Sequence, residues 1–312
     1  MVRQLSVAAV LSLAVTAGSF GADPAVSSVE QAQQMGTEFR PAAETQDAGS
    51  DAVPASEGDP DDDSFGSQQI LKGVEHIPPF DCFAGISAFV TNNVALTRKD
   101  THSDSFLVAT FGFSASRKIT DTLTLDLTTE GGVYRYSRYG EFDMDSVDAG
   151  VGLSYRMPKL WDATVYAQYG YSDLLDGRTN DEFFENHAFT LGVEKVFPIS
   201  RALSLAAGVS GDYNFTDPLG LQREDVGGYA GIHAALTSRL EADLYYRYAF
   251  EVYTEGSRRD NNQVLTLSVQ YTVTNWLSIM GTTYLTINDS NEEVYSYEAL
   301  AGGVGVNVNI AF

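Results

Sequence analysis

From Pro78 to Phe312 the sequence alternates apolar and polar residues with a period of two, and this pattern constrains the fold more than any other feature. A period of two is that of a β-strand, whose successive side chains point to opposite faces of a sheet. The alternating segments persist for about nine to eleven residues, the length that a tilted strand needs to cross a bilayer, whereas strands of globular proteins average about five or six. We count twelve segments, which begin near Asp81, Ser105, Thr122, Ser146, Asp162, Asn186, Ala202, Val226, Leu240, Gln263, Trp276 and Glu298.

The two faces of these segments differ in chemistry. In the segment from Leu240 to Phe250, the even-numbered residues are apolar and the odd-numbered residues include Glu241, Asp243 and Arg247. Alternation alone also fits a soluble β-sandwich, in which the apolar face is buried in a shared core. The segment length and the aromatic residues near segment ends favour a barrel in a membrane, with girdles at both interfaces. The predicted girdle residues are Trp161, Phe197, Phe215, Phe250, Tyr253 and Trp276.

The connections between segments alternate in length. Short turns near residues 116–121, 157–160, 197–201, 237–239 and 274–275 separate longer polar loops near 92–105, 137–147, 172–187, 214–225, 251–262 and 287–298. An even-stranded antiparallel barrel gives this alternation when both of its ends lie on the short-turn side. Because an unpaired edge facing lipid would cost several kcal/mol per exposed backbone group, the first strand should pair with the last. The sequence therefore predicts an all-β fold, a closed antiparallel transmembrane barrel of about twelve strands, with ten or fourteen also compatible.

The first 77 residues have a different composition. An apolar block from Leu5 to Val15 follows Arg3 and precedes small residues, which is typical of a secretory signal peptide in residues 1–22. Residues 23–77 are rich in Ala, Gln, Ser, Asp and Glu and contain few aromatic residues, so they predict a disordered acidic linker. The barrel is expected to occupy residues 78–312.

The last segment alternates strictly and ends in an aromatic residue. This pattern resembles the C-terminal signature of Gram-negative outer-membrane β-barrel proteins, a porin-like class, which present it to the barrel-assembly machinery. The resemblance implies a location in the cell outer membrane, a periplasmic N-terminal linker, and contacts with outer-membrane lipids and lipopolysaccharide. The residues that carry the predicted assembly signal are Val304, Val306, Val308, Ile310 and Phe312.

Odd-numbered and even-numbered residues of a strand face opposite sides of the sheet, and this parity places most of the charged residues on the inner face of the barrel. Small residues at neighbouring inner positions would leave the bore open, and an excess of carboxylates would favour cations. We therefore expect a passive channel for small hydrophilic, preferentially cationic solutes; the alternative is an interaction barrel whose lumen is plugged by internal pairs, such as Arg247 with Glu241 or Asp243. The predicted charged lining is Asp126, Glu130, Asp148, Asp212, Glu241, Asp243 and Arg247.

Other functions find little support in the sequence. With 42 acidic and 19 basic side chains, the net charge of −23 argues against binding of nucleic acid. The single cysteine, Cys82, excludes an intramolecular disulfide and a cysteine-based metal site. Glu241 and Asp243 have the spacing of an acid/base pair, and His187 is expected on the lipid-facing side as in some outer-membrane lipid hydrolases, but no serine accompanies it. We expect no catalytic role, cofactor or metal, and a lipid-modifying enzyme is the remaining alternative.

Overall fold

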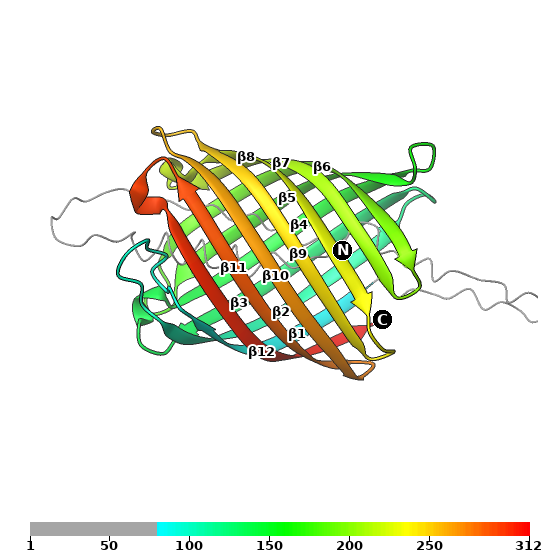
Figure 1. Ribbon diagram of the computed structural model, residues 1–312, viewed down its shortest axis with the longest axis horizontal. Helices are drawn as coiled ribbons and strands as arrows, with labels where there is room; N and C mark the ends of the chain where they lie inside the picture. Colours follow the sequence, from blue (N-terminus) through cyan, green and yellow to red (C-terminus); the bar gives the residue numbers. More distant parts are fainter. Residues whose placement is uncertain (1–79) are drawn as a thin grey trace, which may run out of the picture.

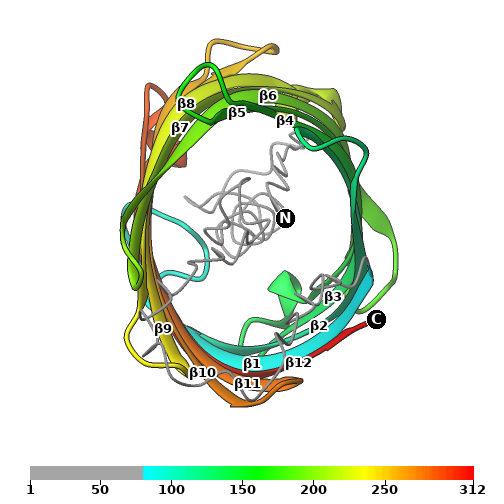
Figure 2. The same cartoon turned by 90° about the vertical axis from the view of Figure 1, so that its right-hand side faces the viewer.

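The computed structural model describes residues 80–312, so the predicted signal peptide (1–22) and linker (23–77) lie outside the described residues. The described chain forms one closed antiparallel barrel in which each strand pairs with its neighbours in sequence and β1 pairs with β12 (Figures 1 and 2). No helix in residues 80–312 is long and apolar enough to cross a membrane. The strands are β1 (Phe80–Thr91), β2 (Asp104–Lys118), β3 (Leu123–Tyr136), β4 (Met144–Met157), β5 (Ala163–Asp176), β6 (Glu182–Ser200), β7 (Leu203–Asp217), β8 (Arg223–Ala235), β9 (Leu240–Tyr253), β10 (Arg259–Thr274), β11 (Leu277–Ser290) and β12 (Tyr297–Ala311).

The seam between β1 and β12 completes the barrel. Its register runs from Asp81 opposite Ala311 to Thr91 opposite Ala301 without interruption. Phe80 and Phe312 exchange backbone hydrogen bonds of 3.3 and 2.9 Å, so these two residues meet at the end of the barrel that carries the short turns. The predicted closed barrel of twelve strands is therefore confirmed.

The connections alternate in length as predicted except at residues 158–162, where a short turn has as many residues as three of the long loops, and several long loops are shorter than expected. The long loops at residues 177–181, 218–222 and 254–258 contain only five residues, because the flanking strands continue into segments that were expected to be loops. Polar residues at these strand ends had suggested loops, although they keep the strand period. We call the end of the barrel at residues 92–103, 137–143, 177–181, 218–222, 254–258 and 291–296 the long-loop rim, and the opposite end the short-turn rim. Three short helices lie in the long-loop rim: η1 (Gly140–Phe142), η2 (Leu219–Leu221) and η3 (Glu293–Tyr295).

The outer wall carries a charge-free band between its two ends. The outward-facing positions of all twelve strands contain Asp, Glu, Lys or Arg only near the rims. On β6 the outward-facing charged residues that bound this band are Glu185, toward the long-loop rim, and Lys195, toward the short-turn rim. Ten residues rise about 33 Å along a strand, or about 25 Å along the barrel axis at a tilt of ~40°. This height is that of the apolar band of outer-membrane barrels.

Aromatic residues mark the ends of this band, with one exception to the prediction. Trp161 and Trp276 lie at the short-turn rim and are exposed, and Phe197, Phe215 and Phe250 also point outward. Tyr253 does not belong to a girdle: its side chain is 4% exposed and faces the lumen. It shares its parity with the inward-facing Glu251, so the assignment to a girdle from its place near the strand end was wrong.

The outward row of β12 is apolar, as the proposed assembly signal requires. Val304, Val306 and Ile310 are exposed on the outer wall, Val308 is half-exposed there, and Phe312 is exposed at its end. Its ring lies 5.9 Å from that of Phe80 on the neighbouring strand. Cys82 also points outward from β1 and is a free, exposed thiol.

Candidate functional site

The inner wall of the barrel is the candidate functional site. All seven residues of the predicted lining face the lumen, because they alternate with exposed outward residues and pair across strands with other inward residues. Glu130 on β3 lies directly opposite Asp148 on β4, and Asp212 on β7 lies opposite Asp225 on β8. Like charges at opposed positions destabilise a sheet unless other groups compensate them.

Hydroxyl groups on adjacent strands stabilise two of these carboxylates. Ser172 donates to Asp148 Oδ1 at 2.6 Å, and Thr190 donates to Asp212 Oδ1 at 2.5 Å. The inner wall therefore contains carboxyl groups held in fixed positions at mid-height on β4 and β7.

The lower part of the wall, toward the short-turn rim, contains more loosely held charges. Asp243 lies 2.8 Å from His233 Nδ1 on the neighbouring strand β8. Arg247 on β9 donates to Asn262 Oδ1 on β10 over 3.5 Å, which is a weak contact. The carboxylates of Asp126 and Glu241 have no hydrogen-bond partner within residues 80–312, and both side chains are half-buried. These two are the acids of the predicted lining that are most available to a passing cation.

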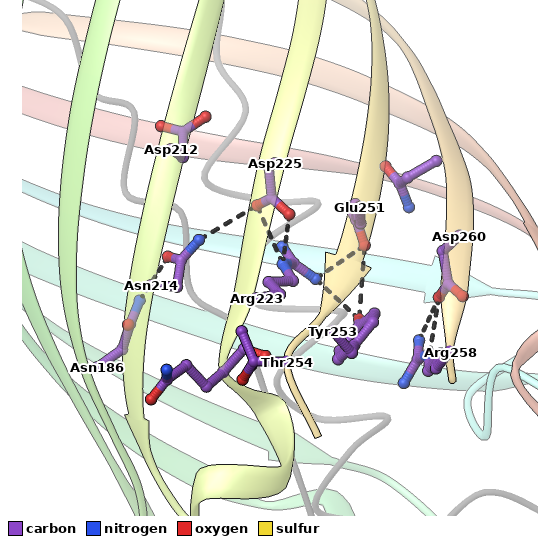
Figure 3. A network of polar contacts seen from close by, with 12 residues as sticks. Asn186, Asp212, Asn214, Arg223, Asp225, Glu251, Tyr253, Thr254, Arg258 and Asp260 are labelled. Atoms are coloured by element: carbon purple, nitrogen blue, oxygen red, sulfur yellow. Dashed lines mark hydrogen bonds and ion pairs between the residues drawn. The ribbon is translucent and has the colours of Figure 1, made fainter. Parts of the chain in front are cut away.

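A buried ionic network occupies the inner wall near the long-loop rim, across β6 to β9 (Figure 3). Arg223 is its centre: its Nε lies 3.0 Å from Asp225, and its Nη1 lies 2.9 Å from Glu251 and 3.0 Å from the Tyr253 hydroxyl. Arg223, Asp225 and Glu251 are each at most 3% exposed. Asn214 extends the network by donating to Asp225 Oδ2 at 3.2 Å. We call these five residues the Arg223 network.

A second guanidinium holds two loops of the long-loop rim in place. Arg258 lies between the rings of Tyr253 and Tyr295, with its Cζ 4.1 and 3.8 Å from their centroids. It also donates to Asp260 Oδ2, which accepts a further bond of 2.9 Å from Asn288 on β11. Because Arg258 belongs to loop 254–258 and Tyr295 to η3, the stacked guanidinium joins neighbouring loops to the wall. A planar guanidinium is suited to such stacking, whereas a lysine ammonium is not.

Sequence reasoning missed both arginines and two of their acidic partners, Asp225 and Asp260. The strand β8 was expected to begin near Val226 and β10 near Gln263, which wrongly assigned Arg223, Asp225 and Asp260 to loops. Arg258 does lie in a loop, but its stacking position could not be predicted. The strand period continues through residues 223–225, where Arg and Asp alternate with Glu224. If the alternation of β8 is continued from Val226 back to residue 223, Arg223 and Asp225 fall on the inner wall.

An apolar cluster lies along the inner wall near the long-loop rim and meets the Arg223 network at Tyr253, which the expected small and polar lining did not predict. Its side chains face inward near the long-loop rim, and rings of Phe89, Phe106 and Tyr136 stack at 4.8 to 5.3 Å. Val94 of loop 92–103 and Phe142 of η1 are buried in the same cluster, so these two connections bend toward the wall. The cluster comprises Phe89, Val94, Phe106, Val108, Tyr134, Tyr136, Phe142, Met144, Leu174, Phe184, Leu221, Tyr253 and Tyr284.

His187 lies on the outer wall, as predicted, within a group of aromatic rings. Its Nδ1 is 2.6 Å from the Tyr169 hydroxyl and its Nε2 is 2.8 Å from Glu185 Oε1. Both ring nitrogens are therefore occupied by neighbours, and a tyrosine stands where a serine hydrolase would need its nucleophile. No group of three or more His, Cys, Asp or Glu side chains in residues 80–312 is arranged to hold a metal ion.

The fold of the chain is shared by solved outer-membrane β-barrel proteins. It is similar to the COG4313 outer membrane channel from Pseudomonas putida F1, with a TM-score of 0.53 and 9% identity over 75% of this chain and 96% of that chain. Weaker similarity extends to the translocator domain of the autotransporter NalP from Neisseria meningitidis, with a TM-score of 0.42 and 13% identity over 75% of this chain and 90% of that chain. The KdgM porin gives a TM-score of 0.37 and 10% identity over 72% of this chain and 98% of that chain.

These similarities establish the fold and leave the activity to be inferred from the residues. No protein-family profile matches the chain, and no curated protein is similar to it in sequence. The resemblance to outer-membrane barrels that the last strand suggested is confirmed at the level of architecture. The particular solute or partner must be argued from the inner and outer walls.

Proposed function

We propose that this chain is an outer-membrane barrel that acts as a passive channel for small hydrophilic solutes, preferentially cations. The observation that carries the proposal is the opposite distribution of charge on the two sides of one wall. The outer side has a charge-free band about 25 Å high. The inner side carries carboxyl groups on β3, β4, β7, β8 and β9, and those on β3 together with Glu241 and Asp243 on β9 are partly exposed. Carboxylates along a wet lumen lower the barrier for cations and raise it for anions.

The orientation in the membrane follows from the same proposal. The long-loop rim would face outward, and the short-turn rim, with the N-terminal linker, would face the periplasm. The apolar outer row of β12 would contact lipid after insertion and the assembly machinery before it. In this arrangement no residue has a catalytic task, and the hydrogen-bonded Tyr169, His187 and Glu185 contribute to the outer wall.

A plugged interaction barrel is the second candidate, and the apolar cluster favours it. Together with the Arg223 network, this cluster places bulky side chains around most of the inner wall near the long-loop rim. Under this alternative the barrel would present its loops to partners without conducting ions.

Single-channel recording in planar bilayers separates the two candidates. We expect the purified full chain to conduct and to show a reversal potential of cation-selective sign in a KCl gradient. The double variant Asp126→Asn and Glu241→Gln removes the two available lumen carboxylates and should shift the reversal potential toward zero. Asp289→Asn is the matched control, because Asp289 is an exposed, outward-facing acid on β11.

Two results would overturn the channel. Absence of conductance from correctly inserted protein would favour the plugged barrel. Anion selectivity, or an equal shift of the reversal potential in Asp289→Asn, would show that the lumen carboxylates do not set the preference.

A further inference from the structure

A depression lies on the outer wall at the long-loop rim, where β11, β12, β1 and β2 run side by side. Its volume is about 630 Å³, within the range of small-molecule sites. The floor crosses the four strands in register, because Thr283 pairs with Gly302, Gly302 with Val90, and Val90 with Ser105. Val90 is 62% exposed and Leu300 beside it is 47% exposed. The floor is thus largely apolar and continuous with the charge-free band.

Gly302 is the reason that this part of the wall is hollow. It lies between Thr283 and Val90, and its missing side chain leaves the floor lower than on the neighbouring strands. A Cβ atom at this position would lie 3.3 Å from Thr283 Oγ1 and 3.6 Å from Thr282 O. These contacts are tight but not prohibitive, so a larger residue would fill the depression without preventing the strands from pairing.

Arg138 supplies an unpaired positive charge at the edge of the depression. Its side chain is exposed and has no ion pair or hydrogen bond to any residue in the range 80–312. The acidic residue in the lining, Asp104, is already satisfied: Oδ1 accepts from the Ser105 amide at 2.8 Å, and Oδ2 accepts from the amides of Arg138 and Tyr139 at 3.1 Å each. Asp104 is also only 6% exposed, so its charge is not presented to a ligand.

We propose that this depression binds a phosphorylated lipid of the leaflet at the long-loop rim. The guanidinium of Arg138 would hold the phosphate by paired charge-assisted hydrogen bonds, which suit the fork geometry of arginine. An acyl chain would lie over Val90, Gly302 and Leu300. The proposal rests on the membrane location given under the proposed function, because only there does the apolar floor meet lipid. That floor favours a lipid over free phosphate, which would need no apolar surface.

Native mass spectrometry on the full chain in phosphatidylcholine nanodiscs tests the site. The two probes are phosphatidic acid and diacylglycerol with the same acyl chains, which differ only in the phosphate. We expect one phosphatidic acid to remain bound and diacylglycerol to be lost. Arg138→Gln should weaken retention of phosphatidic acid about tenfold, since charge-assisted hydrogen bonds exceed the free energy of one decade of affinity. Gly302→Val should weaken it as well, by filling the floor.

Arg259→Gln is the matched control, because Arg259 is an exposed, outward-facing arginine of the same rim on β10. An equal loss in Arg259→Gln and Arg138→Gln would overturn the proposal in favour of general attraction by rim charge. Equal retention of diacylglycerol would show that the phosphate is not recognised. Displacement of phosphatidic acid by millimolar inorganic phosphate would show that only the headgroup is bound.

The test is separable from that of the channel. Arg138→Gln should conduct like the unmodified protein, because Arg138 lies on the outer side of the rim. A protein that binds phosphatidic acid without conducting would overturn only the channel, and one that conducts without discriminating the two lipids would overturn only this site.

Discussion

At the scale of single residues, the inner wall depends on positions that lack a side chain. Gly192 on β6 lies opposite Tyr166 on β5, whose ring covers it: a Cβ atom there would lie 2.3 Å from the ring carbon Cζ. Tyr166 is 1% exposed and shares a hydrogen bond of 3.3 Å with Tyr229. The ring therefore has little freedom to move away.

We predict that Gly192→Ala destabilises the folded barrel by about 1 to 3 kcal/mol, the usual cost of overpacking. The measurement is reversible urea unfolding in lipid vesicles. Gly281→Ala is the control, since the nearest atoms to its added Cβ lie 3.9 Å away. Equal losses of stability in the two variants would contradict the role of the Tyr166 ring.

The Arg223 network gives a second prediction at this scale. Replacing Arg223 with Gln leaves the carboxylates of Asp225 and Glu251 buried without their counter-charge, and breaking such a pair costs about 3 to 5 kcal/mol. Urea unfolding should show this loss, and the double variant Arg223→Gln and Glu251→Gln should recover part of it. Arg178→Gln removes an exposed ion pair with Asp176 and should cost less than ~1 kcal/mol. A small effect of Arg223→Gln would mean that water reaches these carboxylates.

At the scale of elements, Arg258 couples loop 254–258 to η3. We predict that Arg258→Ala speeds hydrogen exchange of the backbone amides in residues 254–258 and 291–296 while the strands stay protected. Each lost cation–π contact is worth about 0.5 to 2 kcal/mol, and exchange should rise by roughly tenfold or more. Arg258→Lys keeps the charge but not the planar stack, so it should give an intermediate rate. Unchanged exchange in these loops, or an equal rise in Arg259→Ala, would contradict the coupling.

At the scale of the whole molecule, the two sides of the wall should respond oppositely to an added charge. Leu191 on β6 is 63% exposed and lies near the middle of the charge-free band, whereas Gln168 on β5 faces the lumen. We predict that Leu191→Arg lowers the stability in a bilayer by about 2 to 4 kcal/mol, because lipid cannot solvate the charge. Gln168→Arg should be tolerated. Equal effects of the two variants on the yield of inserted protein would contradict the assignment of the faces.

The same two-sidedness explains what could be read from the sequence. Because the strand period is two, assigning one residue of a strand to the inner or outer face assigns every other residue of that strand. The barrel, its seam and the lining from Asp126 to Arg247 could therefore be predicted. The ends of the strands were not predictable, because polar residues that extend a strand beyond the membrane resemble loop residues, and this concealed Arg223 and Asp260. The apolar cluster depends on how loop 92–103 and η1 bend toward the wall, which no local pattern encodes.

The placement of Trp161 and Trp276 has an optical consequence. They are the only two tryptophans of the chain, and both lie exposed at the short-turn rim, with 82% and 52% of their surface accessible. Intrinsic fluorescence therefore reports on one end of the barrel alone. A quencher added to one side of a vesicle, or attached at a chosen depth in one leaflet, would change this emission only if the short-turn rim lies on that side. The orientation of the barrel in the bilayer could therefore be measured without an introduced label.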